Sequence, residues 1–352
     1  MFLIVISVSS LLGQEVTIKK DSIPNPFSAL NDGPYIFIES NKLIQKKIIN
    51  GEILSKELKS DAYDTIFVPD EHVYKDVQKI AVISDVHGQY DLAIELLKNN
   101  RIIDENLDWN FDQGHLVLLG DVFDRGDKVN ELLWLIYKLE QQARKVGGRV
   151  HYLLGNHEYM VLHNDLRYIH KKYRLTSRLL YVEYPKLYGN NTVLGRWLRS
   201  KHTIIKINNS IFVHAGVSQE ILSDTDFQLD TINEIMRGSI DISKEELKAT
   251  GFYKTYYGSG SLIWYRGYFE DNLTDKDISD ILEELDSEHI VVGHSSYKEI
   301  VQLFDQKIFG VDSSIKLGAY GEMLFIKNNK YSRRTLTGKR KKFSRTPLKM
   351  DE

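Results

Sequence analysis

Aspartate, asparagine and histidine residues recur in this chain directly after short apolar runs. The runs are KIAVIS, HLVLLG, VHYLLG, SIFV and HIVVG, each four to six residues long. Runs of this length and composition are typical of buried strands. The polar residues that follow them are Asp85, His87, Asp121, Asn156, His214 and His294. Each of the five strand ends therefore presents at least one side chain that can bind a metal ion.

Stretches with helical periodicity separate the predicted strands. In DLAIELLKNN and VNELLWLIYKLEQQARK the apolar residues recur at intervals of three and four, as on one face of a helix. Strands that alternate with helices predict an α/β layered fold, in which sites gather at the carboxyl ends of the strands. We therefore expect the five polar loops to converge.

The residue types narrow the chemistry of this expected site. A single Asp or Asn after a strand is usually a turn or cap residue, but capping does not explain three histidines among the six. Carboxylate, imidazole and amide ligands without sulfur suit Mn, Fe, Zn or Co better than Mg or Ca. Six ligands are too many for one catalytic ion that keeps an open position. They predict two divalent metal ions bridged by Asp121, whose strand should lie between the other two early strands.

A family resemblance extends over residues 80–326. The blocks that carry it are DVHGQ, GDVFDRG, GNHE, VHAG and GH, in this order. The series resembles the calcineurin-like metallophosphoesterases, in particular the PPP-type phosphoprotein phosphatases. TVLGRWLRSK, LIWYRGY and GVDSS are most similar to the bacterial-type, Shewanella-like protein phosphatases. The resemblance implies a central β-sandwich flanked by helices.

The resemblance also implies roles for the residues of the blocks. It assigns Asp85, His87 and Asp121 to the first metal ion and Asp121, Asn156, His214 and His294 to the second. It makes Arg125 a phosphate clamp, His157 the general acid and Asp124 the carboxylate that orients His157. Arg266, in WYRGY, matches the second phosphate-binding arginine, and Asn156 also faces the substrate. The SAPNY loop of the eukaryotic serine/threonine enzymes is absent, so their peptide and toxin recognition does not transfer.

These assignments predict a dinuclear-metal hydrolase of phosphate monoesters, with Mn, Fe or Zn as the ions. The nucleophile is a metal-bridging hydroxide, and His157 protonates the leaving group. The expected substrate is a phosphorylated protein or peptide carrying phosphotyrosine, phosphoserine or phosphothreonine. One alternative is a hydrolase of small molecules such as dinucleoside polyphosphates on the same core. A non-catalytic binding protein is a further alternative, which the intact set of site residues disfavours.

The rest of the chain suggests its organisation. We expect a signal peptide over 1–14 and hence export to the periplasm or medium, or a cytoplasmic protein if this apolar run is instead a buried first strand. A loosely ordered N-terminal segment with an early helix or hairpin should follow over 15–75. The catalytic domain should span 76–330, with a helical basic insertion over 160–206. A basic, disordered tail is expected over 331–352.

Charge and cysteine content limit the possible partners. The net charge of −3 selects no partner, and the absence of Cys excludes disulfides, thiolate metal sites and a cysteine nucleophile. Between His163 and Lys206 there are ten Lys or Arg residues, which could guide an acidic phosphopeptide. We expect the basic tail to be solubilising rather than to bind nucleic acid, and we expect no stable membrane insertion after processing.

Overall fold

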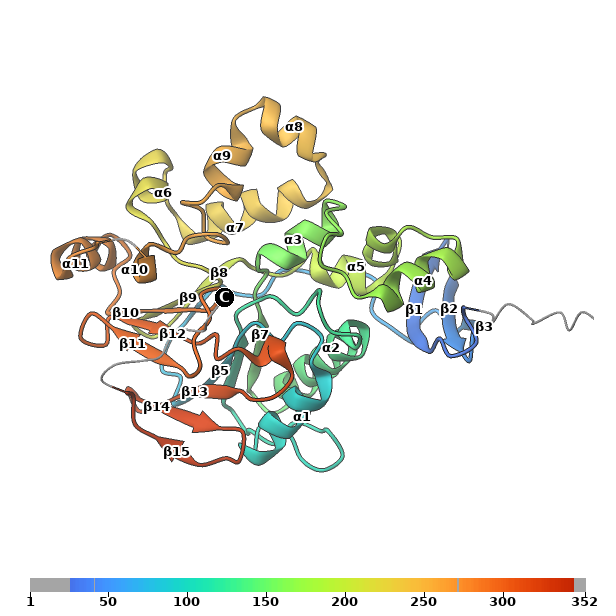
Figure 1. The fold of residues 1–352 in the computed structure, drawn as a ribbon, viewed down its shortest axis with the longest axis horizontal. Coiled ribbons are helices and arrows are strands. Elements are labelled where there is room, and N and C mark those ends of the chain that lie inside the picture. Colours follow the sequence, from blue (N-terminus) through green and yellow to red (C-terminus); the bar gives the residue numbers. More distant parts are fainter. Residues whose placement is uncertain (1–25, 41, 271, 345–352) are drawn as a thin grey trace, which may run out of the picture.

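Two six-stranded sheets face each other at the centre of the structure (Figure 1). This computed structural model describes residues 26–344, with the exception of residues 41 and 271. The predicted signal peptide lies outside the described residues, so export remains a prediction. Among the helices in the described part of the chain, none combines the length and the apolar character needed to cross a bilayer.

The first sheet contains the strands that precede three of the predicted site loops. In spatial order its strands are β15 (Arg340–Lys341), β14 (Lys330–Thr335), β13 (Glu322–Lys327), β5 (Lys79–Ile83), β6 (His115–Leu118) and β7 (Arg149–Tyr152). β5, β6 and β7 are parallel, whereas β13 to β15 pair in antiparallel fashion. β6 lies between β5 and β7, as predicted for the strand that leads to Asp121.

The second sheet contains the strands that precede the two remaining site loops. In spatial order its strands are β11 (Val301–Leu303), β12 (Ile308–Gly310), β10 (His289–Val292), β9 (Ser210–Val213), β8 (Ile204–Ile207) and β4 (Val73–Tyr74). β10 is parallel to both β9 and β12. The carboxyl ends of β9 and β10 therefore lie next to each other.

Alternating side chains of the strands build two separate apolar layers. Val82 and Val117 of the first sheet pack in one buried cluster with Phe212, Val291 and Phe309 of the second. The alternate residues of the first sheet, such as Ala81 and Leu116, join the cluster that contains the apolar faces of α1 (Tyr90–Asn99) and α2 (Val129–Lys145). Since successive side chains of a strand point to opposite faces, this arrangement is the predicted β-sandwich flanked by helices.

Helical segments connect the strands, and those from α6 to α9 (residues 219–257) lie above the sheets in the view of Figure 1. Those between β7 and β8 are α3 (Asn156–Leu162), α4 (Lys171–Leu180), the 3₁₀ helix η1 (Tyr184–Tyr188) and α5 (Val193–Leu198). Those between β9 and β10 are α6 (Gln219–Asp224), α7 (Leu229–Gly238), η2 (Ser239–Asp241), α8 (Lys244–Ala249), α9 (Phe252–Tyr257), α10 (Gly267–Glu270) and α11 (Asp275–Glu284). η3 (Ile315–Leu317) precedes β13.

The N-terminal segment forms the hairpin that was one of the two expectations for it, and with a third strand it is more ordered than we expected. It forms an antiparallel sheet of β1 (Asp32–Glu39), β2 (Lys42–Ile49) and β3 (Glu52–Leu58). Trp134 of α2 donates a hydrogen bond to the carbonyl oxygen of Pro34 (2.9 Å), and Phe37 forms a β-bridge with Thr192. Contacts with residues so distant in the sequence organise this segment, and local patterns do not report them.

The prediction of a disordered tail from residue 331 is wrong for its first part. Residues 330–335 and 340–341 form β14 and β15. Arg333 of β14 is buried and binds the buried carboxylate of Glu322 through two hydrogen bonds of 2.7 and 2.8 Å. A basic composition indicated a solvated tail, but the pairing of this arginine with Glu322 makes the segment part of the sheet.

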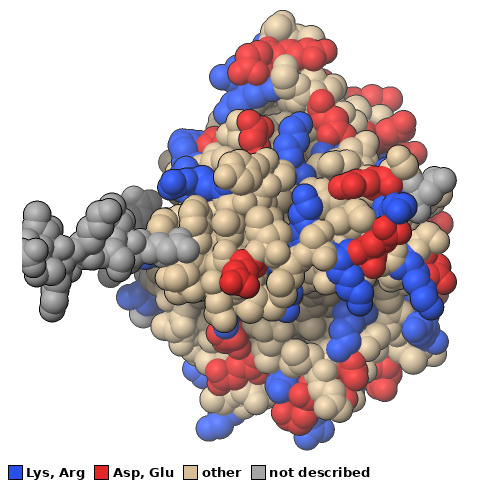
Figure 2. Space-filling view, turned by 90° about the vertical axis from the view of Figure 1, so that its right-hand side faces the viewer, with Lys and Arg blue, Asp and Glu red and all other residues tan. Residues whose placement is uncertain are grey.

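Many basic side chains of the predicted insertion form ion pairs. The pairs are Arg167 with Asp165, Lys172 with Asp32 and Glu131, Arg199 with Asp241, Lys201 with Glu140, and Lys206 with Asp286. Figure 2 shows one face of the molecule, on which basic and acidic side chains are likewise interspersed. The positive field of the insertion is therefore weaker than its composition suggested.

Candidate metal centre

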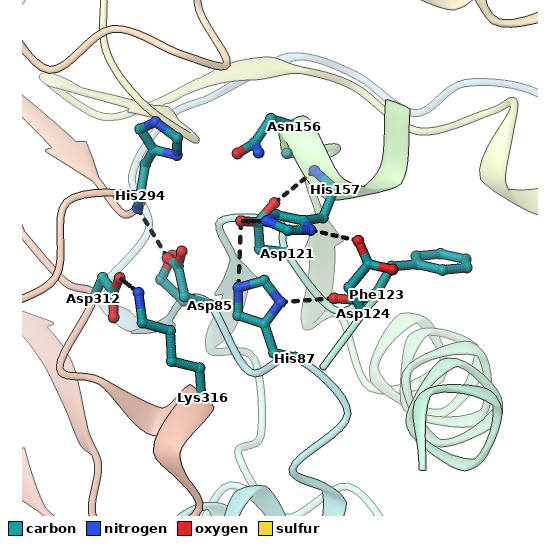
Figure 3. Close-up of polar contacts among 12 residues, drawn as sticks. Asp85, His87, Asp121, Phe123, Asp124, Asn156, His157, His294, Asp312 and Lys316 are labelled. Atoms are coloured by element: carbon teal, nitrogen blue, oxygen red, sulfur yellow. Dashed lines mark hydrogen bonds and ion pairs between the residues drawn. The ribbon is translucent and has the colours of Figure 1, made fainter. Parts of the chain in front are cut away.

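The six predicted ligand residues come together at the carboxyl ends of β5, β6, β7, β9 and β10. Figure 3 shows most of them pointing into one space between the two sheets. All six are buried. The described residues also include two groups whose potential ligand atoms lie within 4.8 Å of one another: His87, Asp121 and His157, and Asp121, His214 and His294. Asp121 belongs to both groups.

One carboxylate oxygen of Asp121 lies between two imidazoles. Asp121 Oδ2 is 3.5 Å from His87 Nε2 and 3.4 Å from His214 Nε2. The other oxygen, Oδ1, accepts a hydrogen bond from the backbone N–H of His157 (3.0 Å). This bond fixes the carboxylate and leaves Oδ2 facing both imidazoles. A carboxylate in this position would be a ligand to each of two divalent cations held by the two imidazoles.

Four potential ligand atoms surround the place expected for the second ion. His214 Nε2 lies 2.8 Å from Asn156 Oδ1 and 3.2 Å from His294 Nδ1, in addition to its approach to Asp121. The other ring nitrogen of His214 donates to the carbonyl oxygen of Leu119 (2.6 Å). Because that bond holds a proton on Nδ1, Nε2 is the ring nitrogen that faces the site.

The place expected for the first ion has a similar arrangement. The Nδ1 of His87 donates to the carbonyl oxygen of Phe123 (2.7 Å), so Nε2 of the neutral ring faces Asp121. Asp85 Oδ2 accepts from the hydroxyl of Ser84 (2.5 Å) and the backbone N–H of His294 (2.9 Å). Asp85 thus connects the loop after β5 with the loop after β10.

The electrostatics of the cluster favour positive charge. Burial and the neighbouring carboxylate of Asp312 raise the pKa of Asp85 to about 7. Burial lowers the pKa of His214, but the carboxylate of Asp121 outweighs it and raises the pKa to about 9. His294 Nε2 is buried without a hydrogen-bond partner. Oxygen and nitrogen donors around concentrated negative charge fit divalent cations of borderline hardness.

His157 lies beside this cluster and is held by Asp124. The distance from His157 Nδ1 to Asp124 Oδ2 is 2.5 Å, whereas His157 Nε2 is 3.9 Å from Asp121 Oδ2. Burial lowers the pKa of His157, but the carboxylates of Asp121 and Asp124 outweigh burial, so the net shift is upward. Nε2 of His157 therefore faces the centre, and its imidazole favours the protonated form.

Two arginines border the centre. Arg125 is exposed and directly follows Asp124. Arg266 is half-buried, and its Nη1 donates to the carbonyl oxygen of His294 (3.1 Å) and the hydroxyl of Ser295 (3.3 Å). The two arginines come from different loops, one next to Asp124 and the other hydrogen-bonded to His294, so every predicted site residue lies in or beside the same space.

An unusual backbone conformation aims the site residues. Positive φ angles, which non-glycine residues rarely adopt, occur at Asp85 (53°), His87 (46°), Asp121 (55°), Asp124 (70°), Arg125 (62°) and His294 (63°). Each such residue costs on the order of 1–3 kcal/mol, and such residues cluster at functional sites. A side chain at Gly155 would place Cβ 2.4 Å from Asp121 Oδ1, so glycine is needed there for close approach.

Glu158 is a site residue whose role the sequence did not reveal. Its carboxylate accepts hydrogen bonds from the backbone N–H groups of Asp121 (2.8 Å), Val122 (2.7 Å), Phe123 (3.2 Å) and Gly155 (2.7 Å), and from the hydroxyl of Tyr152 (2.8 Å). Glu158 therefore holds the loops after β6 and β7 together. The GNHE block contains this residue, but only the tertiary contacts show what it does.

Asp312 is a second residue that the sequence did not single out by its role. It is buried near Asp85 (Figure 3), and its Oδ2 is 3.7 Å from Lys316 Nζ. The hydroxyl of Ser296 donates to the same carboxylate. GVDSS marked this segment as part of the family resemblance, yet the closeness of Asp312 to Asp85 requires the fold.

Comparison with known proteins places this architecture in a family. Residues 78–297 match the calcineurin-like phosphoesterase family. The structure resembles that of a cold-active protein-tyrosine phosphatase of a psychrophilic Shewanella species, with a TM-score of 0.85 and 39% identity over 91% of this chain and 99% of that chain. The Shewanella-like protein phosphatase 1 of Plasmodium berghei is 26% identical over 90% of this chain and 86% of its own length.

A plant relative shows a shorter match. The Shewanella-like protein phosphatase 2 of Arabidopsis thaliana is 25% identical over 236 residues, which cover 55% of this chain and 59% of that protein. The family match extends over more than half of the 352 residues, so the chain belongs to the calcineurin-like phosphoesterase family and is a metal-dependent phosphoesterase.

Proposed function

We propose that this chain is a phosphoprotein phosphatase that hydrolyses phosphate monoesters of tyrosine, serine or threonine at a dinuclear centre. The observation that carries the proposal is the position of Asp121 Oδ2, 3.5 Å and 3.4 Å from imidazoles that belong to two different sets of ligands. The similarity to proteins named protein phosphatases supports the substrate class.

Two divalent cations suit the donor atoms. We propose manganese, with iron or zinc as alternatives, because carboxylate, imidazole and amide donors suit ions of borderline hardness. Asp85, His87 and Asp121 would hold one ion, and Asp121, Asn156, His214 and His294 the other. When bound, such ions polarise phosphoryl oxygens and make water acidic enough to attack at neutral pH.

The protein's own side chains would bind the phosphate and protonate the leaving group. The guanidinium groups of Arg125 and Arg266 can each donate two parallel hydrogen bonds to phosphoryl oxygens. His157 would give the proton on Nε2 to the leaving oxygen while Asp124 holds Nδ1, 2.5 Å away. Asp124 thereby stabilises the protonated imidazole before transfer and fixes its orientation.

A substrate panel tests the proposal. The chain is treated with a chelator, reloaded with manganese, and assayed on one peptide sequence carrying phosphotyrosine, phosphoserine or phosphothreonine, and on diadenosine tetraphosphate. We expect metal-dependent release of phosphate from at least one peptide and slow turnover of the dinucleotide. Fast turnover of the dinucleotide with inert peptides would instead identify a small-molecule hydrolase.

A further inference from the structure

Tyr168 forms an exposed aromatic wall next to the proposed general acid. Its ring centroid is 5.3 Å from that of His157, and the two ring planes are tilted by 57°. The guanidinium carbon of Arg125 lies 5.5 Å from the same ring. Despite these contacts, Tyr168 keeps 43% of its surface exposed. One accessible ring therefore touches both the proposed acid and a proposed phosphate-binding side chain.

The wall is held in place by its surroundings. The carbonyl oxygen of Tyr168 accepts a hydrogen bond from the backbone N–H of Arg125 (2.9 Å). Arg167 lies 5.5 Å from the ring and is itself fixed by two hydrogen bonds of 2.8 Å to Asp165. Because these contacts restrain the position of the ring, contact between the ring and a substrate requires little further ordering.

This position corresponds to the leaving-group side of the reaction. His157 must reach the oxygen that leaves phosphorus, so the substituent on that oxygen passes close to His157 and its neighbour Tyr168. In an aryl phosphate the aromatic ring is bonded directly to this oxygen and can meet Tyr168 edge to face or offset. In phosphoserine the oxygen carries only a methylene group, which offers no ring for such a contact.

We propose that Tyr168 is a specificity residue: its ring contacts the group bonded to the leaving oxygen and favours an aromatic group over an aliphatic one. The inference rests on the proposed function of the site.

The experiment compares the kinetic constants of Tyr168→Ala, Tyr168→Phe and the unsubstituted protein, each loaded with manganese. The substrates are one peptide sequence carrying phosphotyrosine or phosphoserine, and inorganic phosphate serves as a competitive inhibitor without a leaving group. We expect Tyr168→Ala to lower kcat/KM about 3- to 10-fold for the phosphotyrosine peptide, the range for one aromatic pair. The value for phosphoserine and the Ki of phosphate should change less than about twofold, within the few tenths of a kcal/mol typical of surface substitutions.

Two variants separate a contact from a general effect. Tyr168→Phe keeps the ring and should retain the preference for phosphotyrosine. Tyr181→Ala removes another tyrosine of the same region, one that is 94% exposed and ends α4, and should leave both peptides unaffected. Normal turnover of phosphoserine by Tyr168→Ala would also show that this variant folds.

The outcomes that overturn the inference differ from those that overturn the proposed function. Equal losses of Tyr168→Ala on both peptides, or a matching rise in the Ki of phosphate, would mean that the ring only positions Arg125 and His157. An unchanged kcat/KM of Tyr168→Ala for the phosphotyrosine peptide would also contradict the inference. Failure of the unchanged chain to hydrolyse any phosphopeptide, with p-nitrophenyl phosphate still turned over, would overturn the proposed function itself.

Discussion

The carboxylate of Asp121 connects the two halves of the centre. Oδ1 is held by the backbone of α3, and Oδ2 faces imidazoles from the loops after β5 and β9. An amide in its place offers one neutral oxygen and an N–H₂ group that would meet ligand atoms unfavourably. Both proposed ions therefore depend on this one carboxylate.

Asp121→Asn should lose bound metal and activity together. Native mass spectrometry and metal analysis of the manganese-loaded protein would measure the ion content, and hydrolysis of p-nitrophenyl phosphate the activity. Asp127→Asn is the matched control, because Asp127 is exposed in the same loop. Retention of two tightly bound ions by Asp121→Asn would contradict the bridging role.

His157→Ala should separate metal binding from proton transfer. We expect both ions to remain and the rate on phosphopeptides to fall by about 10² to 10⁴, the usual contribution of a general acid. The loss on p-nitrophenyl phosphate should be smaller, because nitrophenolate is a weaker base and needs less protonation. Equal losses on both substrates would remove the acid role, and His289→Ala provides a control at a half-buried histidine that starts β10.

At the scale of elements, one ion pair attaches the C-terminal strands to the sandwich. Glu322 begins β13 and Arg333 lies in β14, and both side chains are buried where they meet. Arg333 also pairs with Glu299 at 2.5 Å. Removing one partner of such a pair leaves a buried charge without compensation, which is more costly than the pair is stabilising.

Arg333→Met should therefore destabilise the protein strongly. We expect the free energy of unfolding to fall by about 3–5 kcal/mol, measured by urea denaturation followed by circular dichroism. Lys341→Met, at an exposed position of β15, should change it by less than about 0.5 kcal/mol. If Arg333→Met also stays within that limit, residues 330–341 do not pack as the structure describes.

At the scale of the whole molecule, buried neutral histidines join parts that are distant in the sequence. His202 accepts a hydrogen bond from Arg237 (2.9 Å) at Nδ1 and donates from Nε2 to the carbonyl oxygen of Asp70 (2.7 Å). His115 contacts His151 across β6 and β7 (2.9 Å). Burial lowers the pKa of both His115 and His202 to about 4.

These histidines should make the fold sensitive to acid. In the unfolded chain their pKa is about 6.5, so between about pH 6.5 and 4 the unfolded state binds more protons than the folded state. The contribution of these neutral histidines to the free energy of unfolding is therefore fully present above about pH 6.5 and is lost as the pH falls towards 4. Thermal unfolding of the chelator-treated chain should give a lower free energy of unfolding at pH 4.5 than at pH 7. In His202→Gln this decrease should be smaller by about 2 kcal/mol. An equal loss in the variant would contradict this account.

The local sequence was sufficient to predict a layered α/β fold and the residues that meet at the edge of its sheets, whereas the sandwich was implied by the family resemblance. An apolar run of strand length can be recognised from neighbouring residues alone, and each run is followed by its polar residue at the carboxyl end of the strand. Parallel pairing of β5, β6 and β7 therefore brings these loops together. The role of Glu158, the aromatic wall at Tyr168, the N-terminal sheet and the burial of Arg333 were decided only by the tertiary structure. Each of them depends on a hydrogen bond, ring contact or ion pair between segments whose closeness no local pattern records, because only the fold determines which distant groups meet.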